Sequence, residues 1–237
     1  MFEVIPALDV AGGRLVRIAP EGPVPVEAFG GDPLAAAAAF VDAGARWLHL
    51  VDVDLALTGV AGTLDLVRSV AALGVAVQAS GGVSSASEAS AFLEAGAARV
   101  VLGSAILALR DVTENLLEGL GESLVLGIEA DGPTIRPRGR GHDLVLRDTL
   151  VWLGRLRVPR YLFTGVGRVG ALAGPDLDGT RALATQTGRP VLVSGGVRGP
   201  DDLRRIADLG EPVEGAIVGR ALYEGLDPRE ALAMSRR

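Results

Sequence analysis

The sequence predicts an α/β protein, and more specifically a (β/α)8 barrel. Across the 237 residues, short apolar segments that resemble strands alternate eight times with helical segments. This alternation, with short connections throughout, is typical of a barrel of parallel strands surrounded by helices. In such a barrel the functional residues lie at the carboxyl ends of the strands.

A repeated motif indicates that the barrel consists of two similar halves. Residues 80–82 and residues 194–196 both read Ser-Gly-Gly at the end of an apolar run. In each half a second apolar run then closes on a glycine, at Gly103 and at Gly219. The corresponding glycines of the two copies lie 114 and 116 residues apart, close to half of the chain.

The chain shows no linker and no shift in composition. We therefore expect one domain over residues 1–237, with half-barrels at about 1–121 and 122–237. An open, doubly wound sheet is the alternative fold. It explains the equal halves less well, and no G-x-G-x-x-G motif follows the first strand.

Eight segments have the composition of parallel strands. Each is a run of mostly aliphatic residues bounded by glycine, proline or polar residues, as expected of strands covered on both faces. The predicted strands are residues 4–9, 47–53, 75–79, 98–102, 123–129, 159–164, 191–194 and 213–218. Residues 14–18 are predicted as an extension of the first strand or as a hairpin.

Helices are predicted after each strand, and capping residues mark several of their starts. Asp32 precedes Pro33, and Ser85 is followed three residues later by Glu88, which is a capping-box pattern. The predicted helices cover about 32–44, 63–73, 85–96, 104–120, 146–156, 179–187 and 200–209, with a last short helix from 227. Stretches rich in glycine and proline are predicted as loops at 19–31, 131–143 and 165–174.

The composition excludes several classes of function. The chain has no cysteine and no lysine, which rules out thiolate nucleophiles, cysteine metal sites, Schiff-base chemistry and a lysine-anchored P-loop. The formal net charge of −6 argues against nucleic acid as a partner. No apolar run is long enough to cross a membrane, and the N-terminus does not resemble a signal peptide. We expect a cytoplasmic monomer that binds neither nucleic acid nor membrane and needs no metal or other cofactor.

The two glycine motifs are candidate phosphate sites. A strand that ends in glycines before a helix presents backbone N–H groups to an anion. The predicted sites comprise Gly81, Gly82, Gly103 and Ser104 in the first half, and Ser194, Gly195, Gly196, Gly219 and Arg220 in the second. The alternative is that the glycines only make tight turns between strand and helix.

Two carboxylates are the candidates for acid–base chemistry. Asp9 ends the first predicted strand and Glu129 ends the fifth, so a barrel places them on opposite sides of its mouth. A pair of this kind can divide proton removal and proton delivery if the two environments separate their pKa values. The alternative is that each carboxylate caps a helix or pairs with an arginine.

Other polar residues lie at the same predicted rim. Thr164 ends the sixth strand and is suited to orienting a substrate hydroxyl, whereas Asp52 and Asp54 either bind substrate or hold loop amides. His49 is predicted inside the second strand as a core histidine, and His142 lies in a loop where either role is open. Arginines in rim loops are candidates for gripping a phosphate or carboxylate, the alternative being solvation; they are Arg17, Arg138 and Arg140.

Several motifs together resemble the ribotide (ProFAR) isomerases of histidine biosynthesis, a family that also includes the cyclase subunit of imidazole glycerol phosphate synthase. The resemblance covers essentially the whole chain. Its motifs are Ile5-Pro6-Ala7-Leu8-Asp9, Val16-Arg17, His49-Leu50-Val51-Asp52, Ser80-Gly81-Gly82-Val83, Val101-Leu102-Gly103-Ser104, Ser194-Gly195-Gly196-Val197 and Gly215-Ala216-Ile217-Val218-Gly219-Arg220-Ala221-Leu222.

Three further motifs are similar to those of the bifunctional phosphoribosyl isomerases, which also perform the matching step of tryptophan biosynthesis. They are Val51-Asp52-Val53-Asp54, Arg138-Gly139 and Gly174-Pro175-Asp176-Leu177. The resemblance implies a half-barrel duplication, two phosphate sites, no cofactor, and the Amadori rearrangement of an aminoaldose to an aminoketose. The first-strand Asp of the family matches Asp9, and its fifth-strand Asp matches Glu129.

The chain departs from the family pattern after the sixth strand. The family usually reads Thr-Asp-x-x-[Lys/Arg]-Asp-Gly-Thr there, and its second catalytic Asp belongs to this motif. In this chain the two aspartates are replaced by Gly165 and Val169. Two further departures are Arg140 in place of a tryptophan and Ser84 in place of an arginine.

Two functions remain open from the sequence. The first is a sugar-phosphate isomerase that uses Asp9 with a relocated acid, for which the candidates are Glu129, Asp176 and His142. The second is a paralogue that has lost this chemistry and binds a phosphorylated ligand or acts on another substrate. The phosphorylated ribotide is the expected small-molecule partner of the first.

Overall fold

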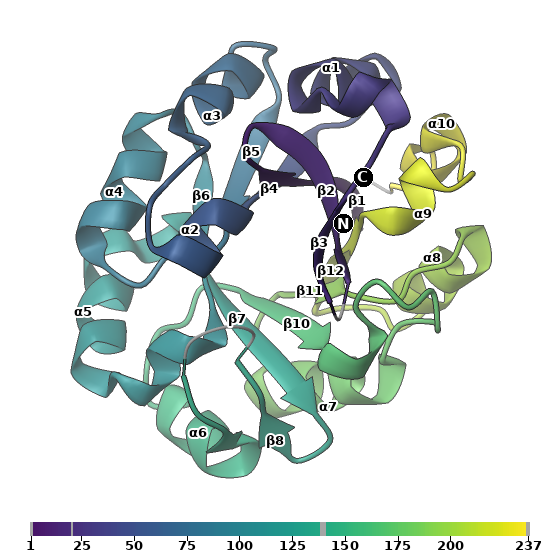
Figure 1. Ribbon diagram of the computed structural model, residues 1–237. Helices are drawn as coiled ribbons and strands as arrows, with labels where there is room; N and C mark the ends of the chain where they lie inside the picture. Colours follow the sequence, from purple (N-terminus) through teal and green to yellow (C-terminus); the bar gives the residue numbers. More distant parts are fainter. Residues whose placement is uncertain (1, 20, 138–140, 236–237) are drawn as a thin grey trace.

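The computed structural model describes residues 2–19, 21–137 and 141–235, and it shows the predicted closed barrel (Figure 1). Every neighbouring pair of barrel strands is parallel, and β10 pairs with β7 to close the ring. Around the barrel the strands follow the order β1 (Glu3–Ala11), β4 (Trp47–Asp52), β5 (Ala76–Ser80), β6 (Arg99–Leu102), β7 (Leu124–Asp131), β10 (Tyr161–Gly165), β11 (Val191–Ser194) and β12 (Val213–Val218). The alternative of an open sheet is therefore wrong.

The helices form a ring outside the strands (Figure 1). Asp32 and Ser85 cap their helices as predicted: the Asp32 carboxylate accepts from the Leu34 N–H at 2.8 Å, and the Ser85 hydroxyl accepts from the Glu88 N–H at 3.2 Å. The ring consists of α1 (Pro33–Asp42), α3 (Leu64–Ala71), α4 (Ala86–Glu94), α5 (Arg110–Leu120), α6 (Leu146–Leu153), α7 (Leu177–Thr187), α8 (Pro200–Ala207) and α10 (Pro228–Leu232).

Several short elements lie where the sequence predicted loops or single helices. The predicted loop 19–31 contains a strand that forms a hairpin with β2, and the predicted helix 104–120 is interrupted at Leu109. The additional elements are β2 (Arg14–Ala19), β3 (Gly22–Pro25), α2 (Val53–Thr58), β8 (Thr134–Ile135), β9 (Leu144–Val145), α9 (Arg220–Tyr223), and the 3-10 helices η1 (Ala28–Gly31), η2 (Ser104–Ala108), η3 (Gly121–Ser123) and η4 (Val166–Arg168).

The apolar core has two layers. The larger layer lies between the strands and the helices, and a smaller cluster fills the inside of the barrel. Because successive side chains of a strand point to opposite faces, neighbouring strand residues alternate between the two layers. The interior cluster comprises Ile5, Ala7, Val101, Val125, Leu162, Leu192 and Ile217, with Trp47 packed against it.

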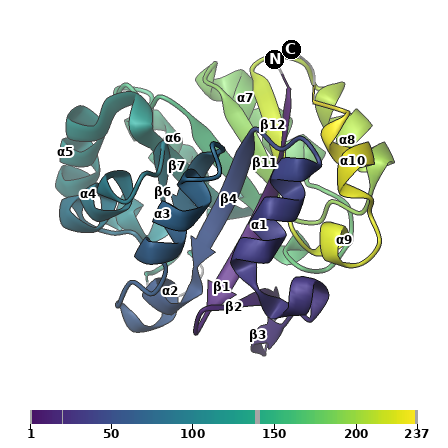
Figure 2. The same ribbon diagram turned by 90° about the horizontal axis from the view of Figure 1, so that it is seen from above.

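The two ends of the barrel differ in their residues. Figure 2 shows the chain termini at one end and α2 with the β2–β3 hairpin at the other, which is the carboxyl end of the strands. At the amino end the Arg99 guanidinium lies 3.7 Å from the centre of the Trp47 ring, and Glu214 forms ion pairs with Arg99 and Arg160. The amino end is thereby closed by a partly buried polar cluster.

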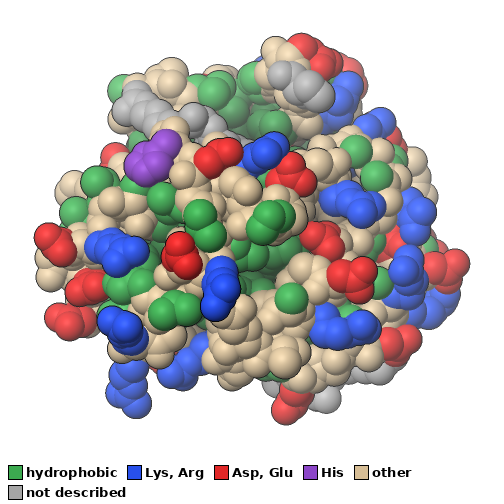
Figure 3. Space-filling view, turned by 90° about the horizontal axis from the view of Figure 1, so that it is seen from below, with side chains coloured by type: hydrophobic (Ala, Val, Ile, Leu, Met, Phe, Trp, Pro, Cys, Tyr) green, Lys and Arg blue, Asp and Glu red, His purple; other side chains and the backbone are tan. Residues whose placement is uncertain are grey.

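No helix among the described residues is long and apolar enough to cross a membrane. The face shown in Figure 3 carries acidic and basic side chains mixed with one another, without a patch of a single sign.

Candidate active site

The barrel mouth is lined by the strand-end residues that the sequence singled out. The neighbours of Asp9, Glu129 and Thr164 along their strands belong to the outer core layer. By the alternation of strand side chains, these three residues face the barrel interior. The structure thus brings the predicted catalytic residues to one end of the barrel.

Asp9 lies on β1, two residues after Ala7, whose carbonyl binds a partly buried tyrosine. The Tyr223 hydroxyl, on α9, donates a 2.7 Å hydrogen bond to the Ala7 carbonyl of β1. Burial raises the pKa of the Tyr223 hydroxyl, and the charge of Asp9 raises it further. The sequence analysis did not single out Tyr223.

Glu129 is hydrogen-bonded to a residue of the first predicted phosphate site. The Ser104 hydroxyl donates to Glu129 Oε2 at 2.6 Å, and both residues are buried. Gly127 makes this approach possible: a Cβ there would lie 2.9 Å from the Leu102 carbonyl oxygen of β6. Thr164 is the strand partner of Glu129 on the other side.

The first glycine motif lies at the carboxyl ends of β5 and β6. Counted on from the pair Ala79 and Val100, Gly82 falls opposite Gly103. Gly81 and Gly82 have φ of +107° and +71°, a region that favours glycine. A Cβ at Gly81 would lie 2.2 Å from the Asp52 carbonyl oxygen, and one at Gly82 would lie 2.6 Å from the Ala56 Cα. The tight turn therefore requires glycine at both positions, as the alternative interpretation of this motif proposed.

The second glycine motif has the same register on β11 and β12. Counted on from the pair Ser194 and Ile217, Gly196 falls opposite Gly219. The Gly174 N–H donates to the Gly196 carbonyl at 2.9 Å, and a Cβ at Gly196 would lie 2.4 Å from the Gly174 carbonyl oxygen. Gly174, which belongs to one of the motifs shared with the bifunctional isomerases and is a further predicted substrate-binding residue, is thus held against this turn.

The two glycine turns are followed by helices in the same way. α4 and α8 begin four residues after Gly82 and Gly196, whereas Gly103 and Gly219 lead directly into the short helices η2 and α9. The prediction that each motif leads into a helix N-terminus is therefore confirmed at Gly103 and Gly219 and is wrong at Gly82 and Gly196.

Arg220 and Arg17 lie on elements that border the mouth. The Arg220 guanidinium donates to the Gly170 carbonyl and, at 2.8 Å, to the Glu224 carboxylate. A Cβ at Gly170 would lie 2.6 Å from the Ile18 carbonyl oxygen, so the loop after β10 meets the β2–β3 hairpin next to Arg17. Arg138 and Arg140 lie outside the described residues.

Asp52 and Asp54 hold loops together. The fully buried Asp52 carboxylate accepts from the Leu55 and Gly62 N–H groups at 2.8 Å, and from both the N–H and the hydroxyl of Thr63 at 2.9 Å. Asp54 accepts from the Gly12 N–H at 2.7 Å. These bonds match the alternative that the two aspartates hold loop amides, so we leave Asp52 out of the residues proposed to bind substrate.

Residues 165–175 of the loop after β10, all of which the structure describes, contain no carboxylate. Val169 lies near the second glycine turn: a Cβ on Gly195 would be 3.5 Å from Val169 Cγ2. A Cβ on Gly165 would be 3.0 Å from Asp176 Cβ, so an aspartate at position 165 would be crowded. Asp176 itself caps α7 by accepting from the Gly179 N–H at 2.9 Å.

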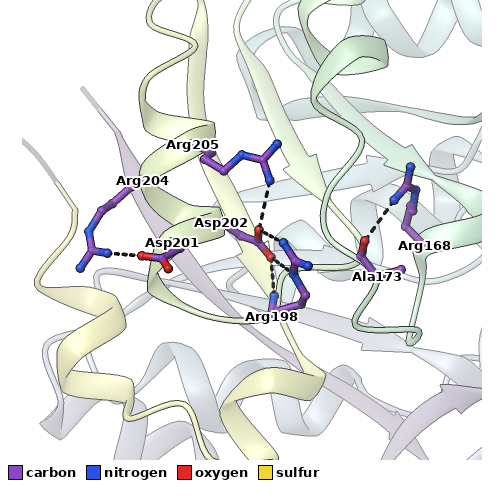
Figure 4. Close-up of polar contacts among 7 residues, drawn as sticks. All are labelled: Arg168, Ala173, Arg198, Asp201, Asp202, Arg204 and Arg205. Carbon is purple, nitrogen blue, oxygen red and sulfur yellow. Dashed lines mark hydrogen bonds and ion pairs between the residues drawn. The ribbon is translucent and has the colours of Figure 1, made fainter.

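Outside this loop, basic and acidic side chains are paired around α8. Figure 4 shows Arg198 donating to Asp202 from both its backbone and its guanidinium, with Arg205 on the same carboxylate. Arg168 points across its own loop to the Ala173 carbonyl at 3.1 Å.

The histidines do not form a metal site with other residues. His142 is exposed, whereas His49 is buried in β4 with its Nδ1 2.9 Å from Gln78 Nε2 on β5. Among the residues that the structure describes, no group of three His, Cys, Asp or Glu side chains could hold a metal ion. Gln78 was not singled out, although a glutamine within a buried strand is a signal that sequence reasoning can use.

The fold and the site define a (β/α)8 barrel with two carboxylates between two glycine turns. The profile of the family described as "Histidine biosynthesis protein" matches residues 3–227. The chain is 38% identical over 239 residues to the 1-(5-phosphoribosyl)-5-((5-phosphoribosylamino)methylideneamino) imidazole-4-carboxamide isomerase of Moorella thermoacetica, which covers 98% of both chains. It is 39% identical to the protein of the same name from Thermobifida fusca, over 100% of this chain and 97% of that one. It is 41% identical to "Phosphoribosyl isomerase A" of Streptomyces griseus, over 94% of this chain and 92% of that one.

The chain belongs to this histidine-biosynthesis family. The resemblance seen in the sequence motifs is thereby confirmed.

Proposed function

We propose that the protein is the ribotide isomerase of histidine biosynthesis, acting on a substrate with two phosphoribosyl groups. The observation that carries the proposal is the placement of Asp9 and Glu129 at one barrel end, on β1 and β7, with three strands between them in either direction. Full-length relatives at 38% and 39% identity carry the name of this isomerase. They give no support to the alternative of a paralogue that has lost the chemistry.

The reaction needs one acid and one base. A carboxylic acid protonates the ribose ring oxygen, the bond from that oxygen to C1 breaks, and the nitrogen lone pair forms a C=N bond. A carboxylate then removes the C2 proton to give an enolamine. The enol hydroxyl finally loses its proton and C1 gains one, so the product is an aminoketose and the overall step is an isomerisation.

The site supports an assignment of these roles. We assign the acid to Glu129, which is buried and hydrogen-bonded to a serine, and the base to Asp9. Thr164, the neighbour of Glu129 in the barrel, is placed to orient a substrate hydroxyl. No other candidate acid is as well placed, because Asp176 caps α7 and His142 is exposed.

The substrate's two phosphates are assigned to the two glycine turns. The first is formed by Gly81, Gly82, Gly103 and Ser104, and the second by Gly174, Ser194, Gly195, Gly196, Gly219 and Arg220. Arg17, on β2, and Arg138, which lies outside the described residues, remain candidates for gripping a phosphate. The predictions of a cytoplasmic monomer without cofactor, and without nucleic acid or membrane partners, go with this proposal. A half-barrel duplication also remains a prediction, with the shared register of the glycine turns as its support.

A turnover assay with the purified protein and the ribotide substrate tests the function. We expect turnover by the parent protein and little gain, within a few-fold, from Val169→Asp, because Glu129 already supplies the acid. A protein that is inert, and that gains activity of about 10²–10⁴-fold from Val169→Asp, would show that the acid is missing. The same assay with the corresponding aminoaldose of tryptophan biosynthesis tests the bifunctional prediction, which the similarity to "Phosphoribosyl isomerase A" favours.

A further inference from the structure

The Ser104 hydroxyl connects the first glycine turn to the carboxylate of Glu129. Ser104 has no exposed surface, and its hydroxyl donates to Glu129 Oε2 at 2.6 Å. A serine hydroxyl carries one proton, whereas an ionised carboxylate and a phosphate dianion can only accept. Ser104 therefore cannot donate to both anions at the same time.

The space on the Cβ side of Gly103 is open. A Cβ built on Gly103 would meet no atom within 4 Å apart from its two chain neighbours, although one of these, Ser104, is fully buried. Gly103 has φ of −67°, a value that any residue can adopt, so the backbone here does not itself require glycine. An anion in this space would lie against the Gly103–Ser104 backbone and next to the Ser104 hydroxyl.

An anion bound there would also lie close to the Glu129 carboxylate. With one hydroxyl between them, the two groups are about two hydrogen-bond lengths apart, or roughly 5 Å. A like charge at this distance disfavours the ionised form of a carboxylate. A proton on Glu129 removes both the repulsion and the competition for the Ser104 proton.

Other charged groups lie around Glu129, and those that follow it on β7 and in the next segment form ion pairs with one another. The Arg136 guanidinium is ion-paired with Asp131 at 2.9 Å and with Asp143 at 3.5 Å. η2 carries no titratable side chain. Groups on the elements packed around β7 include Arg99 at the start of β6 and Tyr161 at the start of β10. The others are Asp131 on β7, Arg136 and Asp143 in the following segment, Arg168 on η4, and, across the barrel, Asp9 on β1 and His49 on β4.

We propose that a phosphate group bound at the Gly103–Ser104 turn places one proton on Glu129 by way of Ser104. Before binding, the Ser104 hydroxyl donates to the Glu129 carboxylate. After binding, Ser104 donates to a phosphate oxygen, and Glu129, which has gained one proton from solvent, donates to the Ser104 oxygen. This inference rests on the proposed function, because the phosphate is that of the substrate.

The coupling has a consequence for catalysis. Glu129 would become an acid when the substrate is bound, which is when the ribose ring oxygen needs a proton. The second turn has Arg220 where the first has Ser104, so the two turns differ in the side chain that an anion would meet. The substrate's own phosphate would thus separate the two carboxylates into an acid and a base.

Calorimetric titration with sulfate tests the coupling. Sulfate remains a dianion between pH 5 and 8, so any change in proton number belongs to the protein. Heats measured in buffers of different ionisation enthalpy give the number of protons taken up. For the parent protein we expect uptake of up to one proton, and an affinity that falls by up to tenfold per pH unit over part of this range.

Three variants make the result specific. In Glu129→Gln the amide N–H donates to Ser104 permanently. Sulfate should therefore bind to this variant without proton uptake, and its affinity should not fall as the pH is raised to 8. Ser104→Ala should lose the uptake and bind more weakly. Glu118→Gln, at an exposed position on α5, is the matched control and should behave as the parent does.

Gly103→Leu separates the two turns. It fills the space at the first turn, so sulfate that still binds reports on the second turn and should bring no proton with it. The proposal is overturned if the parent binds sulfate without proton uptake, if Glu129→Gln keeps the uptake, or if no sulfate binds. If the protein turns over the ribotide but binds sulfate without proton uptake, the coupling is wrong and the isomerase function stands. If sulfate binding is coupled to proton uptake but the protein does not turn over the ribotide, the proposed isomerase function is wrong and the coupling stands.

Discussion

Gly82 and Gly103 follow the carboxyl ends of the paired strands β5 and β6, yet only Gly82 is confined by backbone. A Cβ on Gly82 would be 2.6 Å from the Ala56 Cα, whereas one on Gly103 would meet nothing within 4 Å. Gly82 also has a positive φ and Gly103 does not. Substitution of Gly82 therefore disturbs the fold, and Gly103 is the position at which anion binding can be tested alone.

We expect Gly103→Leu to weaken binding of a bisphosphate ligand without loss of stability. The leucine side chain would take the space of the phosphate and remove two or three charge-assisted hydrogen bonds, each worth about 1.5–3 kcal/mol. Calorimetric titration gives the affinity, and urea denaturation gives the free energy of unfolding. Unchanged affinity would show that this glycine is only part of a turn.

Glu214→Gln should destabilise the barrel and leave the mouth unaffected. Glu214 pairs with Arg99 and Arg160 at the amino end of the strands, and burial followed by the charge of Arg160 lowers the pKa of Arg99 to about 10. Loss of the carboxylate leaves two neighbouring cations without their shared partner, at a cost of about 2–3 kcal/mol. The midpoint of urea unfolding checks this cost. Equal midpoints for variant and parent would contradict it.

Asp202 should contribute stability that depends on pH. The hydrogen bond from the Arg198 side chain, together with its backbone N–H, holds the pKa of Asp202 below its ordinary value. A carboxylate with a lowered folded-state pKa stabilises the fold above its unfolded pKa, at about 3.9, and this contribution is lost as the pH falls through the folded-state value. Asp202→Asn should therefore be less stable than the parent at pH 7.

The difference between Asp202→Asn and the parent should narrow below pH 4. Urea unfolding of both proteins at several pH values between 3 and 7 measures it. Asp201→Asn is a suitable control, since Asp201 lies on the same helix and its side chain is 91% exposed. A difference between Asp202→Asn and the parent that stays constant over this range would contradict the assignment.

The sequence predicted the barrel well because its signals are local and repeated. Eight apolar runs indicated the eight barrel strands, and the two copies of Ser-Gly-Gly marked the carboxyl ends of β5 and β11. The short elements were missed because β3 contains two prolines and β8 has two residues, too few to show a period. The prolines are tolerated because β3 is an edge strand, which pairs only with β2.

The candidate site was predicted less completely than the fold. A carboxylate at a strand end suits a catalytic role and a loop-capping role equally well, and Asp52 took the second because Leu55, Gly62 and Thr63 present their donors to it. The bond between Ser104 and Glu129 joins residues 25 positions apart, one on η2 and the other on β7. Its existence depends on the close approach of β7 to β6 at Gly127, which no local pattern reveals.

The central claim is that Glu129 supplies the acid that the loop after β10 no longer provides. The most direct test is the kcat of Glu129→Gln for the ribotide, measured beside that of the parent. We predict a fall of about 10²–10⁴-fold, or roughly 3–5 kcal/mol in the barrier, with little change in KM. If the parent is active and the kcat of Glu129→Gln is within a few-fold of the kcat of the parent, the claim is contradicted.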